Sequence, residues 1–343
     1  MSDSDIRLLS VGSALPGPPV DNATLARHFG MPALWEQWID VFVGTSTRHL
    51  AVDLASGEVR TSLAELGEQA ARRALDAGGM APADIDLLVL GTANPDLLMP
   101  ATVNMVAEHL GIDGIPTYQL QSGCAGAFQA LDVAVHMLAG GGYRNALVIA
   151  GEVCAKHFDV KADLQALEPA EMVNAVLFGD GAAAVLLTAD PVDGAVVVRK
   201  VLNRLCGLGR EPGQVVPWFG LADRASTPAA VREDYKAIEL SVPIMAAEVL
   251  DELVEAVGWT RSDVDFVLPP QLSGRMSERI RERLDLKDAV EIGCVAETGN
   301  VGNALPFLQL ERLLSRMLPG DRAVGFAIES SKWIKGGFAL ERM

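Results

Sequence analysis

Two stretches of the chain place apolar and polar positions in the same order. In the first, a helical pattern over residues 64–77 ends near a glycine, and a polar turn then leads into a short apolar run within residues 84–90. The same order returns 179 positions later, with a helical pattern over residues 247–257 and an apolar run within residues 263–268. Short apolar runs of this kind predict strands that are buried on both faces of a sheet.

A second pair of segments repeats at almost the same spacing. Met137-Leu138 closes a helical pattern before the apolar run 146–150, and Met317-Leu318, 180 positions later, closes another before the run 323–328. Any α/β protein alternates helices and strands, so one such match alone would carry little weight. Two matches at nearly one offset favour a duplicated α/β fold.

The two predicted halves meet at a turn. Pro191-Val192-Asp193-Gly194 has the composition of a turn, and we therefore divide the chain into an N-terminal half, 1–190, and a C-terminal half, 191–343. No low-complexity segment or flexible linker separates them. We expect the halves to form one compact body.

Composition narrows the classes of function. Half of the 343 residues are apolar and 21% are charged, as in a globular protein. The formal net charge of −17 argues against a nucleic-acid or anionic-membrane surface, because both need clustered lysine and arginine. No apolar run approaches the roughly 18 residues of a membrane helix, and the first residues lack the pattern of a signal peptide. We therefore expect a cytoplasmic protein that binds neither nucleic acid nor membrane.

One of the four cysteines has a setting that suggests chemistry. Cys124 lies in a turn of small residues, just before a helical pattern that runs to Leu138. The unpaired N–H groups at the start of a helix favour a thiolate, and small neighbours leave room for a substrate. A buried core cysteine is the alternative, and the local sequence leaves both interpretations open. The spacing predicts no disulfide framework, and the cysteines that lack this setting are Cys154, Cys206 and Cys294.

The other motifs do not support a hydrolase, a dinucleotide-binding protein or a metal site. A hydrolase nucleophile elbow needs glycine two residues before and after the nucleophile, and Ser122 occupies the first of these positions. Gly140-Gly141-Gly142 lacks the spacing of a dinucleotide-binding loop. Cys154 and His157 are too few ligands for a metal site, so no metal is expected.

A set of motifs occurs together and in order along the chain. They are Trp38-Ile39 with Gly44 and Arg48, Asn94–Gly111, Cys124-Ala125-Gly126, Phe178–Ala184, Pro269-Pro270-Gln271 and Gly299-Asn300. With this set the chain resembles the β-ketoacyl-ACP synthase III branch of the thiolase superfamily over nearly its whole length. The resemblance implies the thiolase fold, in which two α/β halves form a five-layer αβαβα arrangement.

The resemblance also implies the chemistry of the site. In the family, a cysteine accepts an acyl group from the phosphopantetheine thioester of CoA or acyl-carrier protein, and a His–Asn pair helps to decarboxylate malonyl-ACP. Carried over by motif, Cys124 is the nucleophile and Asn300 the amide donor, and no separate cofactor is expected. Pro270 stands at the position of the histidine. Proline has neither a titratable ring nor an N–H, so it cannot act as acid, base or hydrogen-bond donor.

Further positions depart from the family pattern. Ser273 stands where the family has asparagine, and Phe42 where it has an arginine that contacts the CoA nucleotide. Ser330–Trp333 replaces a glycine-rich loop that helps to form the oxyanion hole. The substrate-binding residues that the resemblance implies are Trp38, Phe42, Ser273, Arg275 and Trp333.

These departures leave three hypotheses open. The one we favour is an acyltransferase of specialised metabolism, in which an acceptor attacks the Cys124 thioester with help from His157, Glu152 or a base on the substrate itself. The second is a carbon–carbon condensing enzyme that uses Asn300 and water in place of the histidine. The third is a non-catalytic accessory subunit that pairs with a complete homologue.

The resemblance finally implies partners. The family forms dimers, so we expect a homodimer, or a heterodimer with a homologue, in which the loop Asn94–Thr102 reaches toward the partner's pocket. The acyl donor would be acyl-CoA or acyl-carrier protein. Acyl-carrier proteins are acidic, so a chain with a net charge of −17 needs a local basic patch to bind them. The candidates for that patch are Arg48, Lys236, Arg275 and Arg279.

Overall fold

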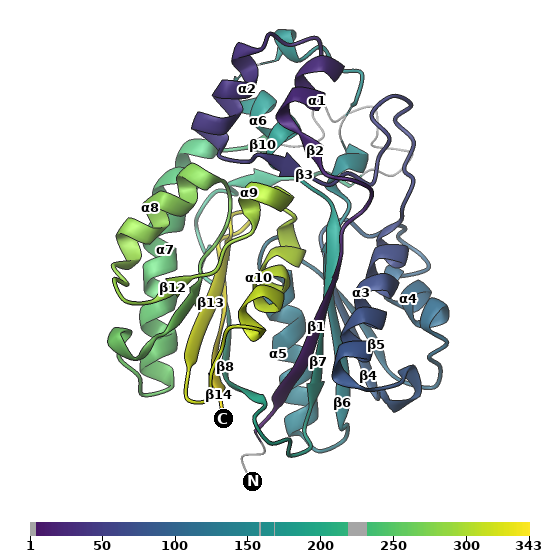
Figure 1. Ribbon diagram of the computed structural model, residues 1–343, viewed down its shortest axis with the longest axis vertical. Helices are drawn as coiled ribbons and strands as arrows, with labels where there is room; N and C mark the ends of the chain where they lie inside the picture. Colours follow the sequence, from purple (N-terminus) through teal and green to yellow (C-terminus); the bar gives the residue numbers. More distant parts are fainter. Residues whose placement is uncertain (1–4, 158, 168, 219–231) are drawn as a thin grey trace.

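A computed structural model of the chain describes residues 5–157, 159–167, 169–218 and 232–343. Strands from both halves join in one ten-stranded sheet (Figure 1). Its strands are β1 (Arg7–Ala14), β4 (Leu87–Thr92), β5 (Thr117–Gln121), β6 (Asn145–Glu152), β7 (Gly181–Thr188), β8 (Val196–Leu205), β11 (Phe266–Leu268), β12 (Val290–Glu291), β13 (Arg322–Glu329) and β14 (Ile334–Arg342). Two short pairs lie outside this sheet, β2 (Val20–Asp21) with β3 (Thr47–Arg48) and β9 (Gln214–Val215) with β10 (Arg232–Glu233).

The order of the strands shows the duplication. Outward from the middle of the sheet, the first half runs β1-β7-β6-β4-β5 and the second runs β8-β14-β13-β11-β12. The directions agree as well, because β4 is parallel to β5 and β6, as β11 is to β12 and β13, while β7 and β14 are antiparallel to their neighbours. The halves join where β1 pairs with β8. The predicted duplicated α/β fold is confirmed, and residues 190 and 191 lie between β7 and β8.

The helices lie in three layers around the sheet (Figure 1). Central helices α5 and α10 each contact strands of both halves, while α3 and α4 cover the first half from outside and α7, with α8 beside it, covers the second. The bounds of these helices are α3 (Leu63–Gly78), α4 (Thr102–Leu110), α5 (Gly126–Ala139), α7 (Tyr235–Ala256), α8 (Gly274–Leu284) and α10 (Leu305–Leu314). Together with the two halves of the sheet they give the predicted five layers.

The middle layer holds a large apolar core. Phe128 of α5 and Phe338 of β14 pack with their ring centres 5.3 Å apart, and Phe307 of α10 is fully buried in the same cluster. Apolar side chains from both halves meet there, so removal of their surface from water holds the halves together.

The predicted repeat corresponds to real elements with local differences. α3 begins after Ser62, which forms a capping box with Glu65, and ends before Gly79, whose φ of +67° is the left-handed conformation that glycine adopts freely. β4 and β11 overlap the predicted apolar runs. The longer helix α7 begins at Tyr235, well before the predicted residue 247, because Asp234 caps it there by accepting a hydrogen bond from the N–H of Ala237.

Shorter helices gather at the end of the molecule drawn uppermost in Figure 1. Side chains of α1, α2 and α6 share a second apolar cluster there, which includes Trp35, Ile39 and Val176. The bounds are α1 (Asn22–His28), α2 (Leu34–Trp38), which continues as a π-helical turn (Ile39–Val43), α6 (Pro169–Leu177) and α9 (Val295–Thr298), with 3₁₀ turns at Pro82–Asp84, Cys154–His157, Leu164–Ala166, Arg261–Asp263 and Gly302–Ala304.

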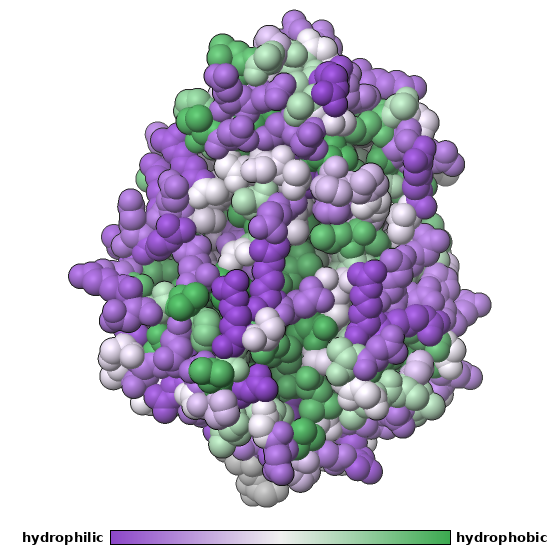
Figure 2. Space-filling model, in the orientation of Figure 1, coloured by the Kyte–Doolittle hydropathy of each residue, from purple (hydrophilic) through white to green (hydrophobic). Residues whose placement is uncertain are grey.

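Hydrophilic side chains cover most of the face drawn in Figure 2, and apolar ones show mainly between α10 and α3. Within the described ranges, no helix is long and apolar enough to cross a membrane.

Candidate active site

The turn that carries Cys124 lies between β5 and α5, where the two halves of the molecule meet. A side chain at Gly126 would place its Cβ only 2.4 Å from Oδ1 of Asn303, so glycine is required where α5 begins. Asn303 belongs to the 3₁₀ turn just before α10, in the other half of the chain. The small residues around Cys124 therefore allow the halves to approach closely.

Asn303 holds the Cys124 turn from both ends. Its Nδ2 donates a hydrogen bond to the carbonyl oxygen of Ser122 at 2.8 Å, and its Oδ1 accepts one from the N–H of Ala127 at 3.0 Å. The same Nδ2 also donates to the carboxylate of Glu152. The position of the sulfur thus depends on contacts that the second half of the chain supplies.

Glu152 is a buried carboxyl group at the end of β6. It also accepts hydrogen bonds from the N–H of Ala93 at 2.9 Å and from Nδ2 of Asn94 at 2.7 Å. Burial outweighs these donors and raises the pKa of Glu152 to about 7. Its side chain does not line the cavity that contains Cys124, so the geometry gives no support to the prediction that it could serve an acceptor there as a base.

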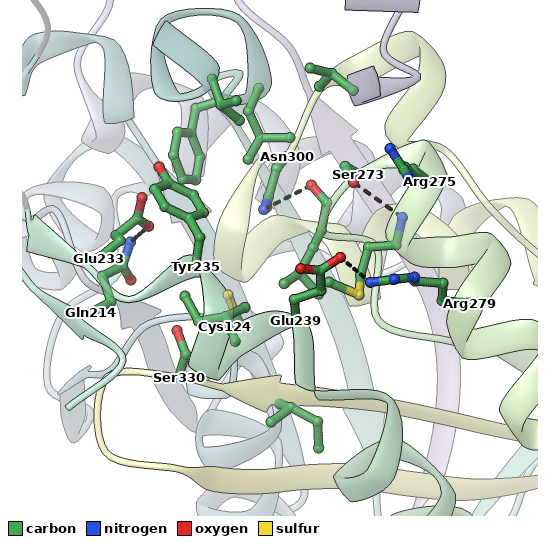
Figure 3. Close-up of a pocket in the computed structure, with 18 of the residues that line it drawn as sticks. Cys124, Gln214, Glu233, Tyr235, Glu239, Ser273, Arg275, Arg279, Asn300 and Ser330 are labelled. Carbon is green, nitrogen blue, oxygen red and sulfur yellow. Dashed lines mark hydrogen bonds and ion pairs between the residues drawn. The ribbon is translucent and has the colours of Figure 1, made fainter. Parts of the chain in front are cut away.

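A cavity of about 310 Å³ opens beside Cys124 (Figure 3). The cavity brings together five of the predicted site residues: Phe42, Cys124, Ser273, Arg275 and Asn300. The other polar residues on its wall are Gln214, Glu233, Tyr235, Glu239, Arg279 and Ser330, among apolar side chains that include Val173, Leu177, Ile238, Leu272 and Met276. A mainly apolar wall with a few polar groups is typical of a small-molecule site.

Residues at the mouth of this cavity come from the π-helical turn and from α8. The ring of Phe42 lies there half-exposed, with the guanidinium of Arg275 5.8 Å from its centre. Trp38 packs behind it, with ring centres 6.3 Å apart, and does not itself line the cavity. The hydroxyl of Ser273 caps α8 by accepting a hydrogen bond from the N–H of Met276 at 3.2 Å.

Trp333 does not line the cavity, contrary to the prediction. Its indole is 1% exposed, and its Nε1 donates a hydrogen bond to the carbonyl oxygen of Glu211 at 2.8 Å. The guanidinium of Arg210 lies 3.8 Å from the centre of its ring. Ser330, from the same segment, reaches the cavity in its place.

Behind Cys124 lies a small cavity of about 20 Å³, which Pro270 and Asn300 also line. The Oδ1 of Asn300 accepts a hydrogen bond from the N–H of Gly302 at 3.0 Å, and its Nδ2 lies 3.5 Å from the carbonyl oxygen of Leu272. These contacts fix the amide beside the sulfur (Figure 3). The space has room for about one water molecule. Pro270 supplies no titratable group to it.

The surroundings of Cys124 favour the neutral thiol. Burial, together with the negative charges of Glu329, Glu152 and Glu233, raises the pKa of Cys124 to about 12. The expectation of a thiolate is therefore wrong, because burial and these carboxylates raise the pKa of Cys124 more than its own backbone N–H lowers it. When an acyl group arrives on the sulfur, the thiol proton must pass to another group.

A separate cavity of about 480 Å³ contains His157. Its wall also includes Glu329 and Lys156, and it shares Gln214 with the cavity beside Cys124. His157 does not line the Cys124 cavity, so the geometry gives no support to the prediction that it could serve there as a base.

Arg48 does not belong to a basic surface, contrary to the prediction. Its side chain is buried, and its guanidinium donates hydrogen bonds to Oδ1 of Asn22 at 2.7 Å and to the carbonyl oxygen of Val176 at 2.8 Å. Arg275 and Arg279 do lie at the mouth of the cavity, and Lys236 is exposed on α7.

Four polar residues of the cavity were not predicted from the sequence: Gln214, Glu233, Tyr235 and Glu239. Gln214 and Glu233 face each other on the short strands β9 and β10, and Nε2 of Gln214 donates a hydrogen bond to Oε1 of Glu233 at 2.5 Å. Strands of two residues have no hydrophobic periodicity, so the sequence carries no signal that would bring these side chains together.

Comparison with known proteins identifies the relatives of the chain. Two family models match it: 3-oxoacyl-[acyl-carrier-protein] synthase III over residues 118–203, and the C-terminal part of the same enzyme over residues 254–330. A β-ketoacyl-[acyl-carrier-protein] synthase III of Rhizorhabdus wittichii is 33% identical over 92% of this chain and 93% of its own. One from Neisseria meningitidis is 30% identical over 87% of each chain.

Solved structures agree with this fold. The protein described as AbyA1, a tetronic acid condensing enzyme, is 60% identical, covers 98% of this chain and 99% of its own, and superposes with a TM-score of 0.95. The priming β-ketosynthase from the R1128 polyketide biosynthetic pathway is 26% identical, with coverage of 98% and 96% and a TM-score of 0.83.

Proposed function

Because this chain belongs to the β-ketoacyl-[acyl-carrier-protein] synthase III family of condensing enzymes, we propose that Cys124 accepts an acyl group from an acyl-CoA or acyl-carrier-protein thioester and transfers it to the hydroxyl of an acceptor. The observation that carries the proposal is the position of Cys124 on the wall of a largely apolar cavity of about 310 Å³, with the Asn300 amide beside it. That position supports an enzymatic role over that of an accessory subunit.

The residues divide the work as follows. The sulfur of Cys124 attacks the thioester carbonyl of the donor, and the donor leaves as a free thiol. Asn300 donates hydrogen bonds near the developing oxyanion or to a water in the small cavity that Pro270 lines. Pro270 offers no imidazole, and this weakens malonyl decarboxylation more than acyl transfer, because transfer forms no carbanion.

A second candidate function is carbon–carbon condensation. The structural relative with 60% identity is described as a tetronic acid condensing enzyme, which favours this candidate. Tetronic acid is a lactone with an enolised β-dicarbonyl, so building its ring from acyl thioesters takes one acyl transfer to oxygen and one new C–C bond. The two candidates are therefore compatible in one specialised biosynthetic enzyme.

Intact-protein mass spectrometry tests the first step. The protein is incubated with a panel of acyl-CoAs and acyl-carrier proteins, beside Cys124→Ala and the matched control Cys206→Ala, which alters a cysteine outside the cavity. We expect an acyl mass gain in wild type and Cys206→Ala that is absent from Cys124→Ala. No gain with any donor, or a gain that persists in Cys124→Ala, would overturn the proposal. Mild alkali then separates the candidates, since it cleaves an ester product and leaves a C–C bond intact.

The loop before α4 exposes apolar side chains. Leu97, Leu98 and Met99 are consecutive apolar residues that are 48%, 68% and 86% exposed, and an apolar run of this kind is typical of a protein interface. Our proposal therefore includes a homodimer. Light scattering of wild type and of a Leu98→Asp/Met99→Asp variant measures the mass in solution, and a monomeric wild type would contradict it.

A further inference from the structure

The two glutamates on the wall of the Cys124 cavity differ in whether they have an ion-pair partner. Four of them line it: Glu233, Glu239, Arg275 and Arg279. Glu239 forms an ion pair with Arg279, and the guanidinium of Arg275 lies near the ring of Phe42. Within the described part of the chain, Glu233 has no cationic partner.

One carboxylate oxygen of Glu233 has a hydrogen-bond partner and the other has none among the described residues. Its Oε1 accepts the hydrogen bond from Gln214, which fixes the carboxylate on the wall (Figure 3). Its Oε2 is buried and has no hydrogen-bond partner among the described residues. A buried carboxylate oxygen without a donor is unfavourable, and a ligand that brings an O–H or N–H group removes that penalty.

The negative charge of Glu233 also affects the pKa of the nucleophile. It is one of the carboxylates that raise the pKa of the Cys124 thiol, as expected for an anion in the same cavity. Glu233 and Cys124 both line this cavity (Figure 3). An acceptor bound between Glu233 and the Cys124 thioester would have its proton next to the unpaired carboxylate oxygen and its oxygen next to the acyl carbon.

We propose that Glu233 is the general base that activates the acceptor hydroxyl when the acyl group leaves Cys124; this inference rests on the proposed function. Oε2 accepts the hydroxyl proton while the acceptor oxygen forms a bond to the thioester carbonyl carbon. The C–S bond then breaks, its electron pair returns to Sγ, and the proton passes from Glu233 to the sulfur. The products are an ester and a neutral Cys124 thiol, with the carboxylate restored.

Other groups in reach are less suited to this step. Glu239 forms an ion pair with Arg279, and the hydroxyl of Tyr235 donates a hydrogen bond to Oδ1 of Asn174 at 2.7 Å. The two oxygens of Glu329 already accept hydrogen bonds from Ser122 and Ser331, and His157 lines the second cavity. Within the described lining, Glu233 is the carboxylate without an ion-pair partner.

Single-turnover discharge of the acyl-enzyme separates this step from acylation. Wild type and Glu233→Gln are acylated with an S-acyl-N-acetylcysteamine thioester, freed of excess donor, and mixed with either ethylene glycol or hydroxylamine. Hydroxylamine is a strong nucleophile that needs no base. We expect Glu233→Gln to acylate normally, to react with hydroxylamine at the wild-type rate, and to transfer to ethylene glycol about 10²–10⁴-fold more slowly.

Two further variants exclude a structural cause. Glu211→Gln changes an exposed carboxylate just before β9 and should behave as wild type. Added formate should restore part of the transfer to ethylene glycol in Glu233→Ala, since a free carboxylate can occupy the vacated position. Transfer at the wild-type rate in Glu233→Gln, or equal slowing with both acceptors, would overturn the role of Glu233. An unacylated wild type would instead overturn the proposed function itself.

Discussion

Ser122 donates a hydrogen bond to the carboxylate of Glu329, although 207 residues separate the two in the chain. Ser122 precedes Cys124 by two positions and Glu329 ends β13, so this bond joins the two halves beside the nucleophile. The other oxygen of Glu329 accepts a hydrogen bond from Ser331. The carboxylate is thus fixed close to the sulfur.

Replacing Glu329 with glutamine should make Cys124 more reactive. After burial, the charge of Glu329 contributes most to raising the pKa of the thiol, so its removal lowers that pKa. A decrease of one unit gives about tenfold more thiolate. We expect alkylation of Cys124 by iodoacetamide at pH 8, followed by mass spectrometry, to be faster by about that factor. Glu108→Gln, an exposed position on α4, is the control, and slower alkylation in Glu329→Gln would contradict the prediction.

Glu152 should make the stability of the protein depend on pH. Its pKa is about 7 in the folded chain against an ordinary value of 4.5, so between these values the folded chain holds a proton that the unfolded chain has released. The stabilisation is complete below about pH 4.5 and is lost as pH rises through 7. Glu152→Gln carries no charge there, so its free energy of unfolding should rise relative to that of wild type by about 1.4 kcal/mol for each pH unit between these two pKa values. Urea unfolding at pH 5 and pH 8 measures this difference, and a constant difference would refute it.

Asn303→Ala should destabilise the fold. It removes the groups that satisfy the Ser122 carbonyl oxygen, the Ala127 N–H and part of Glu152. Each buried polar group left without a partner costs about 1–3 kcal/mol, so the free energy of unfolding should fall by at least that amount. Asn104→Ala removes an exposed asparagine that accepts a hydrogen bond from Thr117, and serves as the control. Equal urea midpoints for the two variants would show that Asn303 has no such role.

Arg275→Glu should distinguish a carrier-protein donor from a small one. Arg275 is exposed at the mouth of the cavity, and acyl-carrier proteins are acidic, so reversing its charge should repel them. We expect KM for acyl-carrier protein to rise several-fold and to depend less on salt, with a smaller loss of kcat/KM for an N-acetylcysteamine thioester. Arg316→Glu, exposed beyond the end of α10, is the matched control. Equal losses with both donors would contradict a docking role.

Much of the fold could be predicted because its strands are buried on both faces. β7 is buried along its whole length, and the apolar run Ala182–Leu187 marks it in the sequence. The glycine after α3 and the repeated order of apolar runs were enough to predict two similar halves. A strand that is buried on both faces is apolar at nearly every residue, and this pattern can be recognised in the sequence without knowledge of tertiary contacts.

The site was less predictable because its polar groups depend on contacts across the chain. Cys124 could be singled out from its small neighbours, but its high pKa comes from burial and from carboxylates on β6, β10 and β13. Arg48 has the composition of a surface residue, and only the backbone oxygens and the amide that surround it explain its burial. Glu233 lies on a two-residue strand whose partner is equally short, so no periodicity marks it.

The mirrored strand order makes the molecule equivalent to a symmetric dimer fused into one chain. β5 leads into Cys124 and α5, while β12 leads toward Asn300 and α10, so the two residues occupy corresponding turns. Identical subunits would have to carry the same residue in both turns. Tandem copies escape that constraint, because one turn can present a sulfur and the other an amide. The fused chain can therefore form an asymmetric reaction centre, which a symmetric dimer cannot form.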